Sequence, residues 1–240
     1  MNQYKILFYL IFPAACMQIG CSNKLDNYEP PRASLSGAII DIRTNDTVPM
    51  ASSIGQGGIL NLFQLNYSST ASGAIGSNFL NNGTYKNASI FSGTYKVAPS
   101  GPFYADTIIA TVNGDTKLDL KVRPWIYVTL KTGNVTDTSA TFTYSIKSND
   151  AAQQIAQGGA FLNTASVVDV QEFLGVNKGD ARYRNIQPVN GDTTITVVFT
   201  GLAPNTTYYI RAGSSTATSS INPQNYYNYS KIYAIKTAGK

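Results

Sequence analysis

The chain has 240 residues, of which only 13% are charged, with 18 Lys and Arg against 13 Asp and Glu. The net charge of +5 is spread thinly and no cluster of basic residues occurs, so the sequence lacks the electrostatic signature of a nucleic-acid-binding protein. It contains no histidine, the commonest general base and the commonest ligand of catalytic zinc. We therefore expect a protein that is not an enzyme, does not bind nucleic acid, and has no cofactor and no metal.

Residues 1–20 have the three-part layout of a secretory signal peptide, with Lys5, an apolar run and then small residues. The run is broken by Pro13 and is shorter than the roughly 20 apolar residues that span a membrane. The stretch "QIGC" resembles a bacterial lipoprotein signal, which implies that Cys21 is acylated. A weaker box ends at Cys16, and a disulfide between the two cysteines of a secreted protein is the other alternative.

Residues 21–33 are polar and contain two prolines, which is typical of an extended linker. The lipid would then attach this tether to the outer membrane, and we expect the folded part to lie on the cell surface. Asp26 is the one acid close behind Cys21, whereas many surface-directed signals are rich in acids. The surface and periplasmic faces therefore both stay open.

Short β-rich runs separated by turn residues recur along the rest of the chain, and no helical period of useful length appears. The expected strands are residues 36–42, 59–67, 93–98, 106–112, 118–122, 126–130, 139–146, 193–199, 207–213 and 231–237. Because Pro124 cannot donate to a strand ladder, we place a boundary there. The sequence predicts an all-β fold of two tandem β-sandwiches, residues 34–123 and 124–240.

In the first sandwich, Asn82 and Gly83 form a turn before one strand, and Gly93 opens the next, which is typical of a hairpin. The stretch "FSGTYKV" resembles the closing strand of transthyretin-like and carboxypeptidase-regulatory-like sandwiches. Relatives of that kind often carry acids in the preceding turn, which suggests calcium. Here Asn81 and Asn82 are neutral, so no metal is predicted.

In the second sandwich, "FTGLAPNTTYYIRAGSST" resembles the region around the fifth and sixth strands of fibronectin type III modules. The resemblance implies a core position for Leu202, a turn at Pro204 and Asn205, and a tyrosine corner at Tyr208, whose hydroxyl caps a nearby backbone group.

The middle of this second sandwich, residues 157–180, fits the resemblance to fibronectin type III modules less well. The "QGG" at 157–159 is expected to be a turn, and Val167, Val170 and Leu174 fit either a helical turn or a loop packed on the sheet. Asp169 and Glu172 are the nearest carboxylate pair, the arrangement that a glycosidase would need.

The acylation signal, "NYEPP", "LSGAIIDI", "ASIFSGTYKV", "GPFYADTI" and "YNYSKIYAIKT" together resemble a family of Bacteroidetes outer-membrane lipoproteins of undetermined function. Members are typically encoded beside TonB-dependent glycan transporters and glycan-capturing lipoproteins. The resemblance implies a non-catalytic accessory in glycan capture and import, with the membrane, a glycan and those two proteins as partners. A structural or adhesive stalk is the alternative.

The candidate ligand-binding residues are the tyrosines of the segment 222–231, Tyr226, Tyr227 and Tyr229. Tyrosines among Asn and Gln resemble the composition of antibody binding loops. Trp125 and Tyr127 are a second aromatic candidate. The alternative is that Tyr227 and Tyr229 start a strand and pack against the sheet, so that Tyr226 discriminates between the two interpretations.

Three "DT" motifs resemble the short signal that Bacteroidetes use for O-glycosylation, which implies modification at Thr47, Thr107 or Thr193. The sequence does not indicate the ligand or the oligomeric state.

Overall fold

The computed structural model describes residues 29–51, 57–65, 73–151, 154–174, 184–217 and 226–239. The expected signal peptide, Cys16 and Cys21 lie outside the described residues. Within the described ranges, no helix is both long enough and apolar enough to span a membrane.

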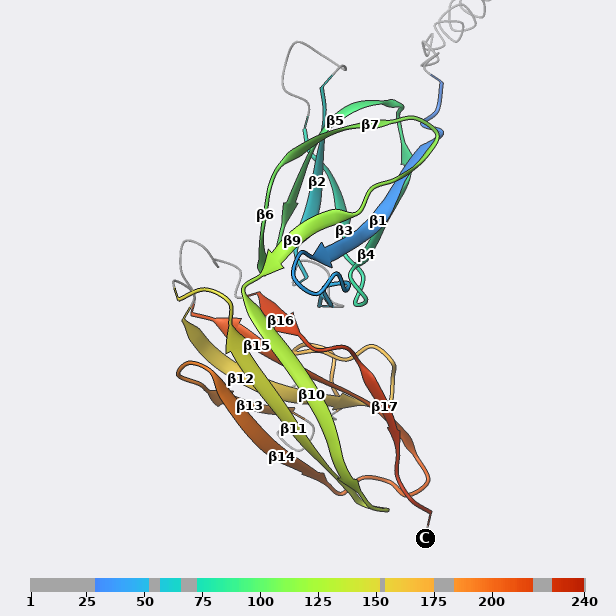
Figure 1. The fold of residues 1–240 in the computed structure, drawn as a ribbon. Helices are drawn as coiled ribbons and strands as arrows, with labels where there is room; N and C mark the ends of the chain where they lie inside the picture. Colours follow the sequence, from blue (N-terminus) through green and yellow to red (C-terminus); the bar gives the residue numbers. More distant parts are fainter. Residues whose placement is uncertain are drawn as a thin grey trace, which may run out of the picture. The chain divides into compact units, whose positions relative to one another are not determined.

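The first half of the chain forms two facing sheets (Figure 1). One sheet has the order β4-β1-β9-β6, and β8 also pairs with β1. Its strands are β1 (Ala33–Asp41), β4 (Thr84–Ile90), β6 (Phe103–Ala105), β8 (Asp115–Lys117) and β9 (Leu120–Pro124). The other sheet has the order β3-β2-β5-β7. Its strands are β2 (Ile59–Gln64), β3 (Ile75–Asn78), β5 (Gly93–Ser100) and β7 (Ile108–Val112).

The core of this first sandwich follows the two-residue period of its strands. Leu60 and Leu62 of β2 and Tyr95 and Val97 of β5 are fully buried, while their neighbours Asn61 and Lys96 point outward. Because successive side chains of a strand point to opposite faces, this alternation places one apolar row of each sheet against the other.

The turn predicted at Asn82 and Gly83 is confirmed, and Gly83 has the positive φ of 80° that favours glycine. The hairpin predicted from it is wrong. β4 pairs with β1, whereas β5 pairs with β2 and β7, so the two consecutive strands lie in different sheets. The short connection at Phe91 crosses between the sheets, and its carbonyl accepts a 2.7 Å hydrogen bond from the hydroxyl of Tyr95.

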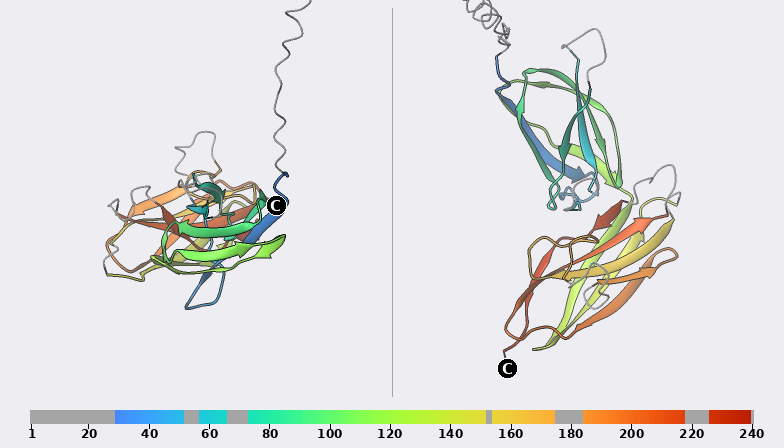
Figure 2. Two further views of the ribbon diagram at one scale, coloured as in Figure 1. Left: turned by 90° about the horizontal axis from the view of Figure 1, so that it is seen from above. Right: turned by 180° about the vertical axis from the view of Figure 1, so that it is seen from behind.

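The second half of the chain forms another sandwich, seen from behind in Figure 2. A three-stranded sheet contains β10 (Ile126–Val135), β11 (Ser139–Ser148) and β14 (Thr193–Thr200) in the order β10-β11-β14. The facing sheet has the order β13-β12-β15-β16, and β17 also pairs with β15. Its strands are β12 (Ile155–Asn163), β13 (Arg184–Pro188), β15 (Thr207–Thr216), β16 (Tyr227–Tyr229) and β17 (Tyr233–Lys236). The predicted all-β sandwich fold is therefore confirmed, and each expected strand overlaps an observed one.

The tyrosine corner is also confirmed. The Tyr208 hydroxyl accepts a 2.8 Å hydrogen bond from the backbone N–H of Ala203, and Leu202 is buried in the same core. Between them the chain reverses at Asn205, whose φ is 50°, in the left-handed region that Asn tolerates better than most residues.

Two expectations for the middle of this sandwich had different outcomes. Gly158 and Gly159 were expected in a turn, but they lie inside β12, where a Cβ on Gly159 would meet the carbonyl oxygen of Asn185 at 2.5 Å. Glycine is required there because the backbones approach closely. The stretch 164–174 is a loop and not a helical turn, and Val170 is buried beside Phe161.

Candidate functional site

The two sandwiches meet directly, and residues 31–240 form one compact unit. β9 ends at Pro124 and β10 begins at Ile126, so one residue separates the two sandwiches along the chain. The buried side chain of Asn228 in β16 accepts a hydrogen bond from the N–H of Ile126 at 3.1 Å. It also donates one to the carbonyl of Pro102 in the first sandwich at 2.9 Å. A strand of the second sandwich is thereby fastened to both sides of the junction.

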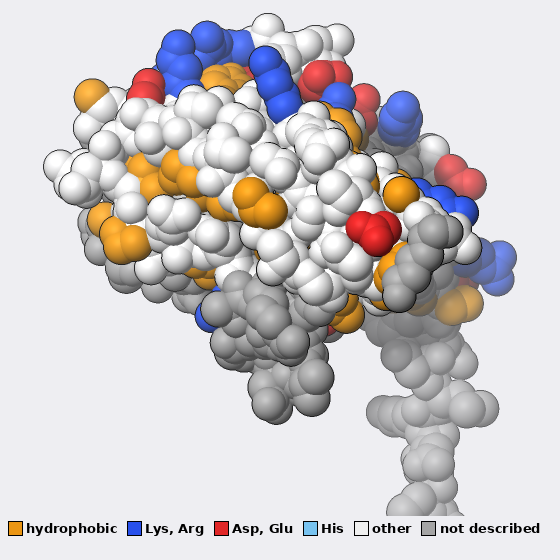
Figure 3. All heavy atoms as spheres, turned by 90° about the horizontal axis from the view of Figure 1, so that it is seen from below, with side chains coloured by type: hydrophobic (Ala, Val, Ile, Leu, Met, Phe, Trp, Pro, Cys, Tyr) orange, Lys and Arg blue, Asp and Glu red, His pale blue; other side chains and the backbone are white. Residues whose placement is uncertain are grey.

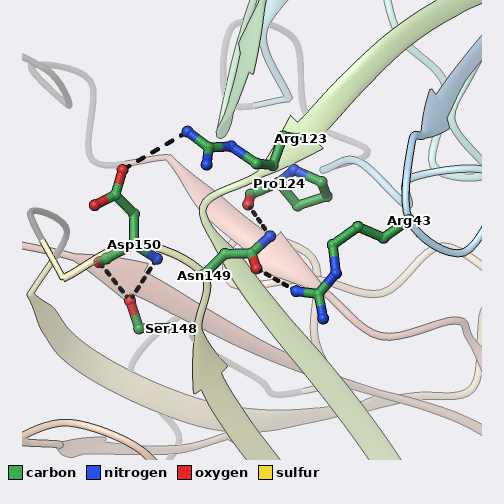
Figure 4. Close-up of polar contacts among 6 residues, drawn as sticks. All are labelled: Arg43, Arg123, Pro124, Ser148, Asn149 and Asp150. Atoms are coloured by element: carbon green, nitrogen blue, oxygen red, sulfur yellow. Dashed lines mark hydrogen bonds and ion pairs between the residues drawn. The ribbon is translucent and has the colours of Figure 1, made fainter.

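A second set of contacts at the junction centres on Asn149, as Figure 4 shows. Its side chain donates to the carbonyl of Pro124 at 2.9 Å and accepts from Nη1 of Arg43 at 2.6 Å. The Arg43 guanidinium carbon lies 5.1 Å from the ring centroid of Tyr127, a cation–π distance. The loop after β1 is thereby fixed against the start of β10.

Arg123 makes a parallel contact to the same loop of the second sandwich (Figure 4). Its guanidinium lies 3.8 Å from the carboxylate of Asp150 and 4.8 Å from the ring centroid of Tyr104. The Tyr104 ring packs edge-on against Trp125. Two arginines of the first sandwich, each stacked on an aromatic ring, therefore hold the loop that follows β11.

A third arginine, Arg211 in β15, is completely buried. Its Nε donates to the carbonyl of Ser230 at 3.0 Å, its Nη2 donates to the carbonyl of Asn81 in the first sandwich at 3.3 Å, and its guanidinium lies 4.1 Å from the ring centroid of Tyr229. Burial lowers the pKa of Arg211 to about 10, and the nearby Tyr229 and Asp169 oppose that shift. The guanidinium is a buried cation held at the junction.

Beside these contacts lies an open cleft of about 260 Å³. Its walls come from the loop after β1, which lies at the end of the first sandwich nearest the second (Figure 1), from the start of β10, and from the segment of β16 and β17. The lining residues are Asp41, Thr44, Asp46, Thr47, Val48, Pro49, Pro124, Ile126, Tyr127, Val128, Thr129, Asn228, Tyr229, Ser230, Lys231 and Tyr233.

The exposed part of this cleft combines an aromatic ring with a loose ion pair. Tyr233 is 41% exposed and is one of the few large apolar side chains that reach the surface. The Lys231 ammonium lies 3.4 Å from the Asp46 carboxylate, and both side chains are more than half exposed. An exposed pair of this kind contributes roughly 0–1 kcal/mol, so both groups can exchange partners at little cost.

The cleft also runs along β10, which lies at the edge of its sheet and, among the described strands, pairs with β11 only. The N–H of Ile126 points to this edge, since it bonds to Asn228 and not to β11. In an antiparallel pair the same orientation recurs at every second residue, so Val128 presents its backbone N–H and C=O to the cleft. Backbone donors and acceptors thus add to the polar lining.

The hydroxyl of Tyr127, another lining residue, lies close to polar and charged side chains. Burial is the main cause that raises the pKa of its hydroxyl, and interaction with the Asp41 carboxylate raises it further, while Asn149 and Arg43 oppose the shift. Asp41 is itself buried and accepts hydrogen bonds from the N–H of Arg43 at 2.9 Å and from the hydroxyl of Thr44 at 3.1 Å. At neutral pH the Tyr127 hydroxyl is therefore protonated and able to donate.

The aromatic residues that we singled out in the sequence fall into three environments. Tyr127 and Tyr229 line the cleft, but Tyr229 is buried and Arg211 covers one face of its ring. Tyr227 stacks on Tyr229 with the ring centroids 5.9 Å apart, and Trp125 is buried in the core of the second sandwich. Tyr227 and Tyr229 therefore follow the alternative interpretation of the sequence, since they lie in β16 and pack against the sheet.

Tyr226 is half-buried against the core of the second sandwich, and burial raises its pKa while a hydrogen bond with Ser100 opposes the shift. Because Ser100 belongs to β5, Tyr226 joins the two sandwiches. The substitution Tyr226→Ala would remove both the packing and the Ser100 contact, so we expect it to lower stability as well as to test binding.

Sequence reasoning did not single out Tyr233, Asp46 and Lys231, three exposed residues of the cleft. Lys231 is the last residue of the segment 222–231 and Tyr233 lies two positions beyond it, so a wider window would have included Tyr233. Asp46 and Thr47 belong to a "DT" motif that we interpreted as a glycosylation signal, and both line the cleft. Thr107 is exposed and Thr193 is half-buried.

The remaining chemistry-bearing groups do not assemble into a second site. Asp169 is buried, and its Oδ1 accepts the backbone N–H groups of Gln171 and Glu172 at 2.8 and 2.9 Å, which is a turn and not a pair of carboxylates. Among the described residues, no group of three or more Asp, Glu, Cys or His could hold a metal ion. Seen from the side of the second sandwich, the surface is mostly uncharged, with few acids (Figure 3).

The first sandwich coincides with a known domain. Residues 33–123 match the N-terminal domain of DUF3823, a protein family of unknown function. The matched range begins with β1 and ends one residue before the end of β9, so the match covers the first sandwich. No curated protein matches the chain.

Solved structures of DUF3823 proteins resemble both sandwiches. A DUF3823 family protein from Bacteroides uniformis has a TM-score of 0.72 at 16% identity, over 86% of this chain and 100% of its own. One from Bacteroides ovatus has a TM-score of 0.65 at 25% identity, over 87% and 100%. A third structure, from Bacteroides uniformis and described as a "putative carbohydrate binding protein", has a TM-score of 0.71 at 21% identity, over 86% and 99%. The fold of two successive sandwiches is thus shared with these proteins.

Proposed function

We propose that the cleft beside the junction binds carbohydrate without catalysing its cleavage. The observation that carries the proposal is the combination in one open cleft of an exposed aromatic ring, Tyr233, with the polar groups of Asp46 and Lys231. A sugar ring presents an apolar face that packs on an aromatic ring and a rim of hydroxyls that bind carboxylates, amides and ammonium groups. A structurally similar protein is described as a "putative carbohydrate binding protein", which supports the same ligand class.

The setting that we propose for this activity follows from the resemblance of the sequence. Acylation at Cys21 would hold the protein on the outer membrane, and the polar tether would let the sandwiches reach a glycan at the cell surface. There the protein would serve as an accessory to a TonB-dependent transporter and its glycan-capturing lipoprotein. The lack of histidine supports a binding role over a catalytic one.

The rigid junction favours a second candidate function, a structural or adhesive stalk. Asn228, Asn149 and Arg211 each bond across the two sandwiches, and a spacer needs such stiffness. A stalk, however, needs no exposed ring in a cleft. The two candidates therefore differ in what they require of Tyr233.

The experiment measures binding of the purified chain to a panel of soluble polysaccharides by affinity electrophoresis and calorimetry. We expect Tyr233→Ala to weaken binding about tenfold, equivalent to ~1.4 kcal/mol. Ile109→Ala is the control, because Ile109 is an exposed apolar side chain on β7, 62% exposed against 41% for Tyr233, and does not line the cleft. Equal affinity of Tyr233→Ala and the control would overturn the cleft as the binding site and favour the stalk.

A further inference from the structure

The charges that line the cleft indicate which class of glycan it accepts. Two carboxylates, Asp41 and Asp46, and one ammonium, Lys231, belong to the lining. An acidic sugar, whether a uronate or a sulfated residue, would bring its own negative charge into a cleft that is lined by these two carboxylates. Like charges at close range disfavour such a complex unless an unpaired cation compensates them.

The cations near the cleft are already engaged with the protein. The Lys231 ammonium pairs with Asp46. Arg43 does not line the cleft, and its guanidinium donates to Asn149 and stacks on Tyr127. Arg211 is buried against Tyr229 and bonded to Ser230 and Asn81. Of these contacts only the exposed Lys231–Asp46 pair can open at little cost, and an anion bound to Lys231 would then lie close to the released Asp46 carboxylate, which repels it.

The hydroxyls of a neutral sugar add no charge to the cleft and can bind to the same groups. The exposed carboxylate of Asp46 has two oxygens that can accept hydrogen bonds from two adjacent hydroxyls of one sugar, and Lys231 offers up to three N–H donors to ring or hydroxyl oxygens. Thr44, Thr47 and Ser230 line the same space. Because the ion pair is weak, its groups can bind a sugar without losing much free energy.

We infer that the cleft selects a neutral glycan, with Asp46 and Lys231 binding its hydroxyls and Tyr233 packing on its apolar face. This inference rests on the proposed carbohydrate-binding function. Asp46 follows β1 in the first sandwich, and Lys231 follows β16 in the second, 185 positions later. The sugar is thus bound by both sandwiches at once, and its binding adds contacts across the junction.

The test compares neutral polysaccharides (xylan, galactomannan, mixed-linkage β-glucan) with anionic ones (polygalacturonate, alginate, a sulfated galactan). We expect the chain to bind at least one neutral polymer ten times more tightly than any anionic one, at both low and physiological salt. Asp46→Asn, which keeps the side-chain shape but removes the charge, should weaken that binding tenfold. Lys231→Gln should weaken it several-fold.

Matched controls are Asp106→Asn and Lys117→Gln, which change the same charges at exposed positions outside the cleft. Both should bind as the unchanged chain does. Since Asp46 and Lys231 are exposed, their variants should melt at the original temperature, which a circular dichroism scan checks.

The outcomes distinguish failure of the neutral-glycan inference from failure of the proposed carbohydrate-binding function. If the chain prefers an anionic polymer and Tyr233→Ala abolishes that binding, the inference of a neutral glycan is overturned. The cleft then remains a carbohydrate-binding site. Unchanged affinity of Asp46→Asn for a neutral polymer overturns the role of the ion pair. If neither panel binds, or if binding survives Tyr233→Ala, the proposed function fails and this inference fails with it.

Discussion

The side-chain amide of Asn228 donates a 2.9 Å hydrogen bond to the carbonyl oxygen of Pro102, 126 positions earlier in the sequence. The same side chain accepts from the backbone of Ile126, so one buried amide satisfies groups of both sandwiches. The cleft borders this contact, because Asn228 and Ile126 both line it. The stability of the junction and the shape of the cleft are therefore linked.

Asn228→Ala should lower the free energy of unfolding by about 1–3 kcal/mol, because it leaves a buried carbonyl and a buried N–H without their partner. Urea denaturation followed by tryptophan fluorescence measures the change, since the single tryptophan, Trp125, lies at the junction. Asn113→Ala on the exposed surface is the control and should stay within about 0.5 kcal/mol of the original. A loss no larger than that of the control would contradict the role of Asn228.

Tyr208→Phe should cost roughly 0.5–1.5 kcal/mol, because it removes the hydroxyl that accepts from Ala203. Tyr144→Phe is the matched control. The Tyr144 side chain is equally buried, but no described residue forms a hydrogen bond with its hydroxyl. Denaturation midpoints in urea should therefore fall for Tyr208→Phe and stay level or rise for Tyr144→Phe. Identical midpoints would argue against the tyrosine corner as a stabilising contact.

Arg211→Met should destabilise the chain by about 3–5 kcal/mol, in the range found when one partner of a buried charge pair is removed. The substitution keeps much of the side-chain volume, but it removes the donors to Ser230 and Asn81 and the cation near the buried Asp169. Arg211→Lys retains the charge and should cost less. Thermal unfolding of the two variants measures the order, and equal losses would show that the charge of Arg211 is not what matters.

Stability should be flat between about pH 6 and 9, because the chain has no histidine. Above that range it should fall. Burial raises the pKa of Tyr144 from 10.0 to about 12, and it raises those of Tyr85 and Tyr229 as well. The folded state thus keeps these protons more tightly than the unfolded state, so their stabilising effect is complete below pH 10 and is lost as the pH rises towards 12.

Denaturation midpoints recorded from pH 6 to pH 12 test this expectation. Tyr144→Phe should fall less steeply above pH 10 than the original chain. A midpoint that rises above pH 10, or that changes strongly between pH 6 and 9, would contradict the assignment of the buried tyrosines.

Cys21→Ser should release the protein from the membrane fraction, because the sequence predicts that Cys21 carries the lipid. Cys16→Ser is the control and should stay bound. Fractionation of cells that express each variant decides between them. Release of Cys16→Ser, with Cys21→Ser retained, would place the acylation at the other cysteine.

The sequence by itself determined the fold class and the position of most strands. The alternation of apolar and polar residues with β-branched and aromatic side chains is a local property, and it predicted strands such as β2, β5 and β11 without any knowledge of their partners. The tyrosine corner was implied by the resemblance of "FTGLAPNTTYYIRAGSST" to fibronectin type III modules, and its two partners, Ala203 and Tyr208, lie only five positions apart. The turn at Asn82 and Gly83 was predictable as well, because a turn depends only on residues that are adjacent in the sequence.

The tertiary structure decided everything that depends on distant residues. β4 and β5 looked like a hairpin because strand pairing is not written in the local pattern, and the sheets separated them. Gly159 looked like a turn residue because its need for glycine arises from the neighbouring strand β13, where an added Cβ would lie 2.5 Å from the carbonyl oxygen of Asn185. The cleft was equally hidden, because Asp46 and Lys231 meet only when two sandwiches pack together. Tyrosines that look alike in the sequence became core or surface according to which face of a strand they occupied.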